Sequence, residues 1–290
     1  MRELNSTSRQ ATALPPYATH PRAADAVIRI EHVTKVFRGR NHDTVTALEG
    51  VSLSVPYGEF VTVVGPSGCG KSTLLKMIAG LVPVSSGRIW YQDREVCELN
   101  THVGYVPQES KLFPWLTLEE NVAFGLEFRS FSRAEKARRV HYLIGLAGLT
   151  GFEQHYPAQL SGGMSKRASI IRALAYDPAV ILMDEPFGPL DAQTRMILQD
   201  ELLNIWERQR QTIVFVTHDL IEAVALADRV VVMGHRPGRI KEVITVPMSR
   251  PRNIFAIHRQ AGFAEAHERL WNIFRHELNF ITHRAGGESA

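Results

Sequence analysis

The stretch that decides the fold runs Phe60-Val-Thr-Val-Val64 and continues as Gly65-Pro-Ser-Gly-Cys-Gly-Lys-Ser-Thr73. The first five residues form a dense β-branched run, which predicts a buried strand. An apolar helical pattern follows over 74–78, and Gly80 ends that helix. A strand, a glycine-rich turn and a helix in this order predict a loop whose backbone N–H groups converge on phosphate oxygens.

The glycine-rich turn matches the pattern G-x4-G-K-[ST], which indicates a nucleoside triphosphate. In such a loop Lys71 reaches the outer phosphates, and the Ser72 hydroxyl ligates Mg²⁺. The alternative is a glycine-rich turn that binds nothing. We expect the whole loop to bind the nucleotide, namely Gly65, Pro66, Ser67, Gly68, Cys69, Gly70, Lys71, Ser72 and Thr73.

Two carboxylates follow a second apolar run, Val180-Ile-Leu-Met183. Open α/β sheets place their ligands at the carboxyl ends of strands, where Asp184 and Glu185 would stand. We expect Asp184 to hold Mg²⁺ through water and Glu185 to orient or deprotonate an attacking water. The alternative is a solvated acidic strand end without chemistry.

Two weaker patterns also point to phosphate. Leu160-Ser-Gly-Gly-Met164 opens a helix and would form a second phosphate cradle, useful if it completes the site of a partner molecule. The alternative is an ordinary helix N-cap. His218 follows the apolar run 213–216 and is placed to donate a hydrogen bond to the outer phosphate, or else serves only the structure.

Strand and helix patterns alternate along most of the chain, which predicts an α/β fold with a largely parallel sheet. Beyond those quoted, strands are expected at 28–33, 51–55, 213–216 and 230–233, and helices at 134–149, 168–174, 192–209, 219–227 and 263–277.

The composition excludes several classes of protein. The 290 residues hold 33 Lys and Arg against 30 Asp and Glu, a net charge of +3 that gives no reason to expect nucleic acid. The two cysteines, Cys69 and Cys97, cannot form a disulfide framework. We expect residues 1–25 to be a disordered tail, because residues 1–21 are rich in Ser, Thr, Ala and Pro and have no apolar period. The stretch also lacks the apolar core of a secretory signal, and a transit peptide is the alternative.

In this order the motifs resemble those of the ATP-binding subunit of ABC transporters. The loop at 65–73 is similar to Walker A, Leu160–Met164 to the signature, and Asp184-Glu185 to Walker B. Gln108 resembles the Q-loop glutamine, Asp191 the D-loop aspartate and His218 the switch histidine. The resemblance implies an α/β P-loop NTPase with a mostly parallel core sheet, an antiparallel β subdomain and an inserted helical subdomain.

The resemblance also implies domain limits and roles. The ATP-binding domain would span 26–250, with its helical subdomain at about 110–175 and a C-terminal helical extension at 251–290. The chain would be an ATPase that uses ATP and Mg²⁺ and pairs head to tail with a second copy. The implied roles are catalysis for Glu185 and His218, Mg²⁺ for Ser72, Gln108 and Asp184, action in trans for Ser161, Gly162, Gly163 and Met164, and dimer contact for Asp191.

Two positions depart from the family pattern. Phe37 stands where the family usually has a tyrosine that stacks on adenine, and a phenyl ring is able to stack in the same way. Ser165 stands where many relatives carry a basic residue, and we expect Lys166 and Arg167 to keep the charge nearby.

The stretches 112–125, 236–240 and 250–252 resemble the nitrate, sulfonate and taurine import family, as does the helix near Trp271. The resemblance implies a peripheral subunit at the cytoplasmic membrane face, energising uptake through a permease fed by an external binding protein. Phe113 and Trp115 would contact the permease, or else pack against the helical subdomain. Alternatives for the whole chain are another transporter, including an exporter, and a non-transport ABC ATPase.

Overall fold

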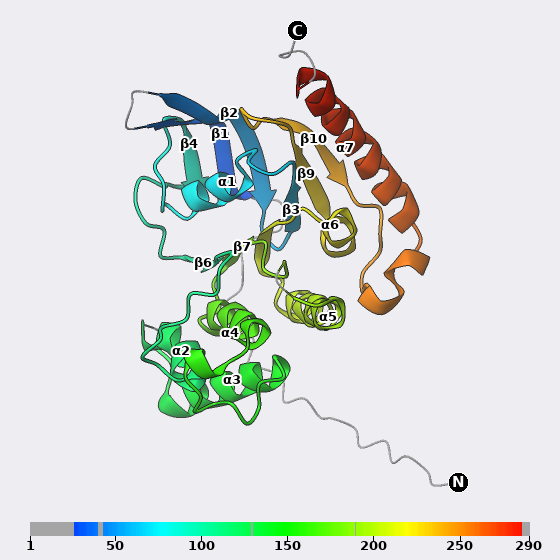
Figure 1. Ribbon diagram of the computed structural model, residues 1–290. Helices are drawn as coiled ribbons and strands as arrows, with labels where there is room; N and C mark the ends of the chain where they lie inside the picture. Colours follow the sequence, from blue (N-terminus) through cyan, green and yellow to red (C-terminus); the bar gives the residue numbers. More distant parts are fainter. Residues whose placement is uncertain (1–25, 40–42, 129, 189, 286–290) are drawn as a thin grey trace, which may run out of the picture.

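Two sheets and a helical lobe build the molecule (Figure 1). The computed structural model describes residues 26–39, 43–128, 130–188 and 190–285; the predicted tail at 1–25 lies outside them. One sheet has six strands in the order β10-β9-β3-β8-β7-β6, and the other has four in the order β2-β1-β4-β5.

The six-stranded sheet forms the centre of the core. Five neighbouring strands run parallel, and β10 pairs antiparallel at the edge. Strands β3, β7 and β8 are buried along their whole length, as their apolar runs predict. The strands are β3 (Phe60–Val64), β6 (Val103–Val106), β7 (Val180–Asp184), β8 (Thr212–Val216), β9 (Arg229–Met233) and β10 (Ile240–Thr245).

The four-stranded sheet is antiparallel throughout. Its strands are β1 (Ala26–Arg38), β2 (Thr44–Pro56), β4 (Ser86–Tyr91) and β5 (Arg94–Glu95). Buried and exposed residues alternate at the end of β2, as expected for a sheet with one face on the core. The fold is therefore α/β, with the predicted mostly parallel core sheet and an antiparallel sheet beside it.

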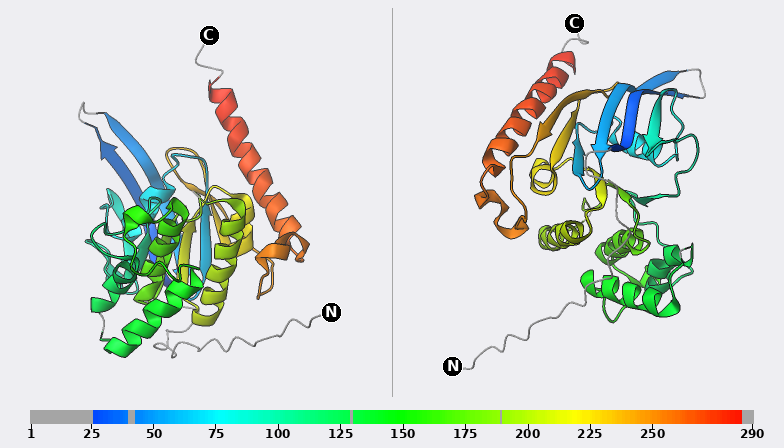
Figure 2. Two further views of the ribbon diagram at one scale, coloured as in Figure 1. Left: turned by 60° about the horizontal axis from the view of Figure 1, so that its bottom comes forward. Right: turned by 180° about the vertical axis from the view of Figure 1, so that it is seen from behind.

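The helical lobe lies apart from the two sheets and is inserted between β6 and β7, which are neighbours in the sheet (Figures 1 and 2). It holds α2 (Leu118–Ala123), η1 (Phe124–Phe128), α3 (Arg133–Leu146), η2 (Pro157–Gln159) and α4 (Gly162–Ala175). Capping boxes at Thr117 and Ser132 begin α2 and α3. This insertion places the lobe beside the carboxyl end of β6.

The remaining helices pack on the sheets, and an apolar cluster that includes Phe60, Phe187 and Trp206 fills the core. They are α1 (Lys71–Ile78), α5 (Ala192–Gln209), α6 (Leu220–Leu226), η3 (Ile254–Arg259) and α7 (Phe263–Ala285). In the part of the chain that the structure describes, no helix is long and apolar enough to cross a membrane.

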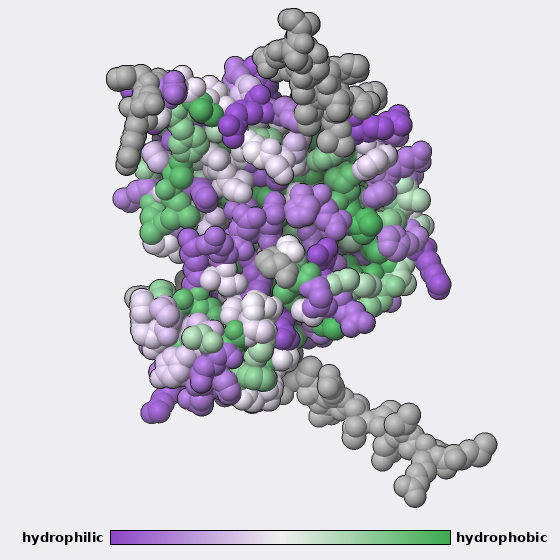
Figure 3. Space-filling model, viewed as in Figure 1, coloured by the Kyte–Doolittle hydropathy of each residue, from purple (hydrophilic) through white to green (hydrophobic). Residues whose placement is uncertain are grey.

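Helix α7 packs on the core through its first turns, where Phe263, Ala266 and Leu270 are buried. Hydrophobic surface gathers toward this side of the molecule, between α6 and α7, whereas hydrophilic side chains cover the middle of the same face (Figure 3). Arg269 adds an ion pair to Glu242 of β10 at 2.6 Å. The extension after the core therefore lies against α6 and β10.

The predicted strands and helices are confirmed, with boundaries shifted by up to eight residues. The helix expected at 192–209 has those bounds, whereas the one expected at 263–277 extends to Ala285. Four short strands and α2 were not predicted, because runs of two to six residues carry little periodicity. The division of the chain into domains stays a prediction.

Candidate functional site

The glycine-rich loop joins β3 to α1, as its sequence predicts. Gly70 is the N-cap of α1 and has a φ of 102°, which only glycine adopts without strain. A Cβ atom at Gly70 would lie 2.6 Å from Cδ2 of Leu48, so a side chain has no room there. The loop therefore depends on glycine for both its conformation and its close contact with β2.

Lys71 and Ser72 open α1 and are held by different partners. Nζ of Lys71 donates to the carbonyl oxygens of Gly65 at 2.8 Å and Pro66 at 3.0 Å. Oγ of Ser72 donates to Oδ1 of Asp184 at 2.8 Å. Burial raises the pKa of Asp184, and the hydrogen bond from Ser72 opposes that effect. Two of the three expected Mg²⁺ ligands, Ser72 and Asp184, thus lie side by side.

Glu185 leaves the sheet in an unusual backbone conformation. Its φ of 45° is in the left-handed region, which a non-glycine residue adopts only when its surroundings impose it. The backbone N–H of Glu185 donates to the carbonyl of Val216 at 3.0 Å. Its Oε2 lies 3.2 Å from Nδ1 of His218 and accepts from Nε2 of Gln108 at 3.4 Å. Three predicted residues from three loops therefore meet at one carboxylate oxygen.

A cavity of about 500 Å³ joins these groups. Ten predicted residues line it: Phe37, Ser67, Gly68, Gly70, Lys71, Ser72, Thr73, Gln108, Glu185 and His218. Asp184 and Cys69 are buried, Asp184 at Ser72 and Cys69 within the loop. Phe37 keeps 42% of its surface exposed at the cavity, as a ring that stacks on a ligand requires. The volume suits a ligand of nucleotide size.

The signature residues do not line this cavity. Ser161 is the N-cap of α4, where its hydroxyl accepts from the N–H of Met164 at 3.2 Å, and both Ser161 and Gly162 are exposed. Asp191 caps α5 in the same manner, and its hydrogen bonds at Thr194 lower the pKa of its carboxyl. Both segments thus present capped helix starts at the surface.

Phe113 and Trp115 lie in the segment between β6 and α2. Trp115 is 70% exposed, whereas Phe113 is half-buried against Phe124, with ring centroids 4.6 Å apart. The guanidinium of Arg172 lies 5.2 Å from the centroid of the Phe113 ring. Phe113 therefore packs on the helical lobe, as one alternative expects. Trp115 faces outward, as the permease alternative expects.

The residues at the Ser72–Asp184 contact fit Mg²⁺. A hydroxyl and a carboxylate oxygen are hard donors, and Mg²⁺ in nucleotide sites takes one or two carboxylates together with phosphate oxygens. Within the described ranges no cluster of three or more His, Cys, Asp or Glu forms a closed metal cage. An open site of this kind has room for ligands from a phosphate chain.

Two further side chains near the site were not predicted to act there. Arg236 lines the cavity and donates through Nη2 to the carbonyl of Gly68 at 3.2 Å. Arg236 belongs to the stretch 236–240, whose resemblance to an import family assigns the residue no role at the cavity. Lys166 was expected to keep charge at the signature; instead its side chain is buried, and burial lowers its pKa to about 8. Arg167 likewise turns to the carbonyl of Ala147 at 2.8 Å.

Comparisons with known proteins agree with this geometry. A family model described as "ABC transporter" matches residues 48–188. An uncharacterized ABC transporter ATP-binding protein of Methanocaldococcus jannaschii is 46% identical over 251 residues, or 87% of this chain and 92% of the relative. The aliphatic sulfonates import ATP-binding protein SsuB of Bacillus thuringiensis is also 46% identical, over 78% of this chain and 88% of its own length.

Solved structures of ATP-binding cassettes are also similar to this chain. A dimeric ATP-binding cassette in a post-hydrolysis state, bound to ADP and Pi, is 32% identical with a TM-score of 0.68. A dimeric bacterial ABC transporter cassette is 33% identical with a TM-score of 0.69. Each match covers 75% of this chain and 98% of the solved chain.

Proposed function

Because the chain belongs to the ATP-binding subunits of ABC transporters, which are ATPases, we propose that its cavity binds ATP and that Glu185 directs its hydrolysis. The phosphate chain would lie on the loop 65–73 at the N-terminus of α1, where backbone N–H groups and the helix dipole favour anions. Lys71 would leave its loop carbonyls for the outer phosphates. Phe37 would stack on the base.

The reaction needs a water positioned in line with the terminal phosphorus. Glu185 would accept the proton of that water as its oxygen bonds to phosphorus and the bond to the bridging oxygen breaks, giving ADP and phosphate. His218 and Lys71 would stabilise charge on the transferred group. Mg²⁺ held at Ser72 and Asp184, with Gln108 nearby, would neutralise phosphate charge.

The contact of Glu185 with both Gln108 and His218 at the mouth of the cavity carries this proposal. Glu185→Gln keeps the shape and removes the base, so we expect ATP binding within about twofold of wild type and turnover lowered at least ~100-fold. Steady-state hydrolysis and equilibrium ATP binding measure the two effects. Glu268→Gln, the same change on exposed α7, is the control. Undiminished turnover in Glu185→Gln would rule out the assignment.

We infer that the active form is a head-to-tail dimer. The matched solved cassettes are dimeric, which supports this assembly. Each nucleotide would be bound between one loop 65–73 and the partner's signature, so that Ser161, Gly162, Gly163 and Met164 act in trans. This arrangement explains why one chain carries two phosphate cradles. Asp191 would lie at the dimer contact.

We further propose that the dimer energises uptake of a small anion or sulfonate. The SsuB relatives are named for aliphatic sulfonate import, which supports the importer over the exporter alternative. The chain would act at the cytoplasmic membrane face on permease subunits fed by an external binding protein. Trp115, which is 70% exposed, would contact the permease.

Growth after deletion of the gene tests the cargo. Loss of growth on taurine or alkanesulfonate as sulfur source, or on nitrate as nitrogen source, identifies the class of cargo. A plasmid copy of the gene should restore growth. Growth unchanged on all three would exclude this cargo class. Co-purification with a protein of several membrane spans would still distinguish a transporter subunit from a non-transport ATPase.

A further inference from the structure

A buried lysine on the helix after the signature has no part in the function proposed above. The side chain of Lys166 on α4 is fully buried. Its Nζ donates to the carbonyl of Pro107 at 2.7 Å and to that of Gln108 at 2.8 Å. A buried ammonium is costly unless its donors are paired, so the two bonds fix the ammonium and the carbonyls together.

The two carbonyls belong to a segment without helix or strand. Residues 107–116 follow β6 as irregular chain, and the Gln108 side chain is exposed. Nevertheless Nε2 of Gln108 lies 3.4 Å from Oε2 of Glu185. A shift in the backbone of Gln108 would move its amide away from the carboxylate, so the position of this segment decides whether Gln108 reaches Glu185.

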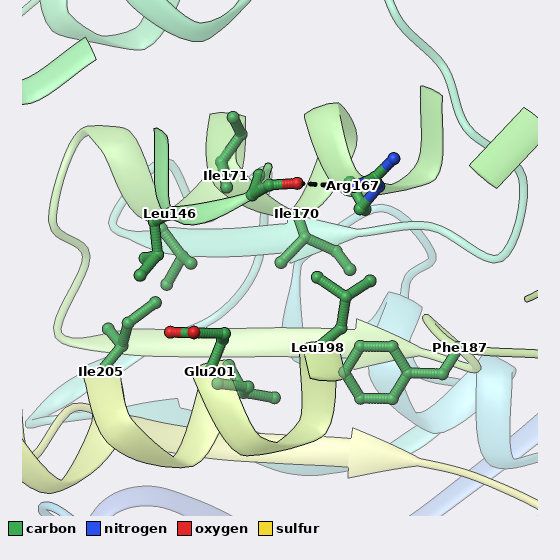
Figure 4. Close-up of a pocket in the computed structure, with 11 residues that line it drawn as sticks. Leu146, Arg167, Ile170, Ile171, Phe187, Leu198, Glu201 and Ile205 are labelled. Atoms are coloured by element: carbon green, nitrogen blue, oxygen red, sulfur yellow. Dashed lines mark hydrogen bonds between the residues drawn. The ribbon is translucent and has the colours of Figure 1, made fainter. Parts of the chain in front are cut away.

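The other hydrogen bonds of α4 reach different parts of the chain: Arg167 donates to the carbonyl of Ala147 at 2.8 Å, and Arg139 donates to the carbonyl of Leu174 at 3.1 Å. Toward α5, α4 borders an apolar cavity of about 20 Å³. Figure 4 shows Ile170 and Leu146 on one side of this cavity, opposite Leu198 and Ile205 of α5. Apolar contacts are non-directional, whereas hydrogen bonds depend on angle. The bonds of Lys166 are therefore the directional contact between α4 and the start of the irregular segment.

We propose that Lys166 is a positioning residue that ties α4 to Gln108 and so holds the Gln108 amide against Glu185. This inference rests on the proposed ATP hydrolysis, which Gln108 and Glu185 would serve. Ser161, about one and a half turns before Lys166, would contact the partner's nucleotide in the dimer. One short helix would thus join the in-trans contact of one site to the glutamine of the other.

Hydrogen exchange tests the tie without any use of activity. In Lys166→Met, which keeps the apolar stem and removes the donors, amides of 105–112 should exchange at least ~10-fold faster than in wild type. Tyr176→Phe is the matched control, because it removes a hydrogen bond from the C-cap residue of α4 to β6, from Oη of Tyr176 to the carbonyl of Val103 at 3.1 Å. Unchanged exchange in Lys166→Met, or an equal rise in Tyr176→Phe, would overturn the proposal.

Kinetics then separate positioning from a loss of packing. Lys166→Met should lower kcat at least ~10-fold with KM for ATP within about twofold, since the loop that binds phosphate is untouched. Lys166→Gln restores two N–H donors without charge and should recover kcat to within about threefold of wild type. Equal loss of kcat in both variants, or full kcat in Lys166→Met, would refute the hydrogen-bond role.

The proposal stays testable if Lys166→Met does not fold or if wild type shows no turnover. If Lys166→Met does not fold, Lys166→Gln decides: near-normal turnover and exchange support the tie, and lost turnover with normal exchange refutes it. If wild type itself shows no turnover, the proposed hydrolysis fails, and the exchange of 105–112 alone decides whether Lys166 holds the segment.

Discussion

Glu185 shows how a single backbone angle sets the geometry of the site. A left-handed φ on a non-glycine residue costs about 1–3 kcal/mol, and here it turns the carboxylate toward His218 and Gln108. The sequence predicts that Glu185 follows a buried strand at the ligand edge of the sheet. It does not predict the φ, because the conformation is imposed by the hydrogen bond to Val216 and by neighbours distant in sequence.

A second carboxylate, Glu222, lines a small cavity together with His218 and is not among the predicted site residues. It is 5% exposed, and its Oε1 accepts from Nε2 of Gln199 at 2.8 Å. Burial raises its pKa to about 7, and hydrogen bonds from Thr217 and Gln199 oppose that rise. Asp219 adds to the rise, whereas Arg195 opposes it.

The ionisation of Glu222 predicts a pH dependence of stability. The pKa of 4.5 in the unfolded chain rises to about 7 in the folded protein, so the folded state binds the proton more tightly. The contribution of Glu222 is therefore full below pH 4.5 and is lost as the pH rises through 7. Each pKa unit is worth ~1.4 kcal/mol, which sets an upper limit of ~3 kcal/mol for this loss.

Glu222→Gln removes the ionisation and keeps an acceptor for Gln199. We expect urea unfolding to give equal stability for the variant and wild type near pH 4, and a variant more stable than wild type at pH 8. Asp200→Asn, the corresponding change at a half-buried position of α5, should give a difference that does not follow this profile. A gap between Glu222→Gln and wild type that is constant from pH 5 to 8 would show that Glu222 does not titrate in this range.

At the scale of elements, α6 links the site to the C-terminal extension. Asp219 caps its N-terminus through the N–H groups of Ile221 and Glu222, one residue after His218. At its other end, the buried guanidinium of Arg252 donates to three carbonyls, from Val224, Ala225 and Ala227, at 2.7–3.2 Å. These are carbonyls that a helix leaves unpaired at its C-terminus. The stretch 250–252 therefore caps the C-terminus of α6, a role that its resemblance to an import family does not imply.

Arg252→Met tests this cap. Loss of the guanidinium leaves buried carbonyls without donors, each worth about 1–3 kcal/mol, so we expect unfolding free energy to fall by at least ~2 kcal/mol. Arg239→Met is the control, because its exposed ion pair with Glu49 should contribute less than ~1 kcal/mol. The shift of the urea midpoint at constant slope measures both. Equal shifts in the two variants would contradict the cap.

Elements differ in how far the sequence predicts them. Helix α5 was predicted to its last residue because 18 residues carry a clear period and begin at the capping residue Asp191. Strand β6 was missed because its four residues include Gly104 and show no alternation. The inward turn of Lys166 could not be predicted either, since its carbonyl partners lie 58 and 59 residues away in the chain. Local sequence patterns predict long elements and motifs. Tertiary contacts determine short strands and the positions of side chains such as Lys166.

At the scale of the whole molecule, the two predicted phosphate-binding segments lie in different places on one chain. The cavity is lined by residues of the loop 65–73, by Gln108, Glu185 and His218, whereas Ser161 and Gly162 form the exposed start of α4 outside it. An exposed helix N-terminus with free N–H groups favours anions, so a second chain presenting Ser161 to the phosphates would complete the site. Since the same contact would occur twice, ATP would stabilise a closed dimer by binding that state preferentially.

A substitution at Ser161 tests the composite site. In the Glu185→Gln background, where ATP should persist, we expect ATP to convert the protein from monomer to dimer in light scattering. Ser161→Arg would fill the space of the partner's phosphates, so the double variant should bind ATP and remain a monomer. Ser132→Arg is the matched control, because Ser132 is also an exposed N-cap serine of the helical lobe and accepts from the N–H of Glu135 at 3.3 Å. Both arginine variants lose a cap worth about 1 kcal/mol, so only the dimer contact distinguishes them. Dimers in Ser161→Arg, or their loss in Ser132→Arg, would mean that the signature does not complete the partner's site.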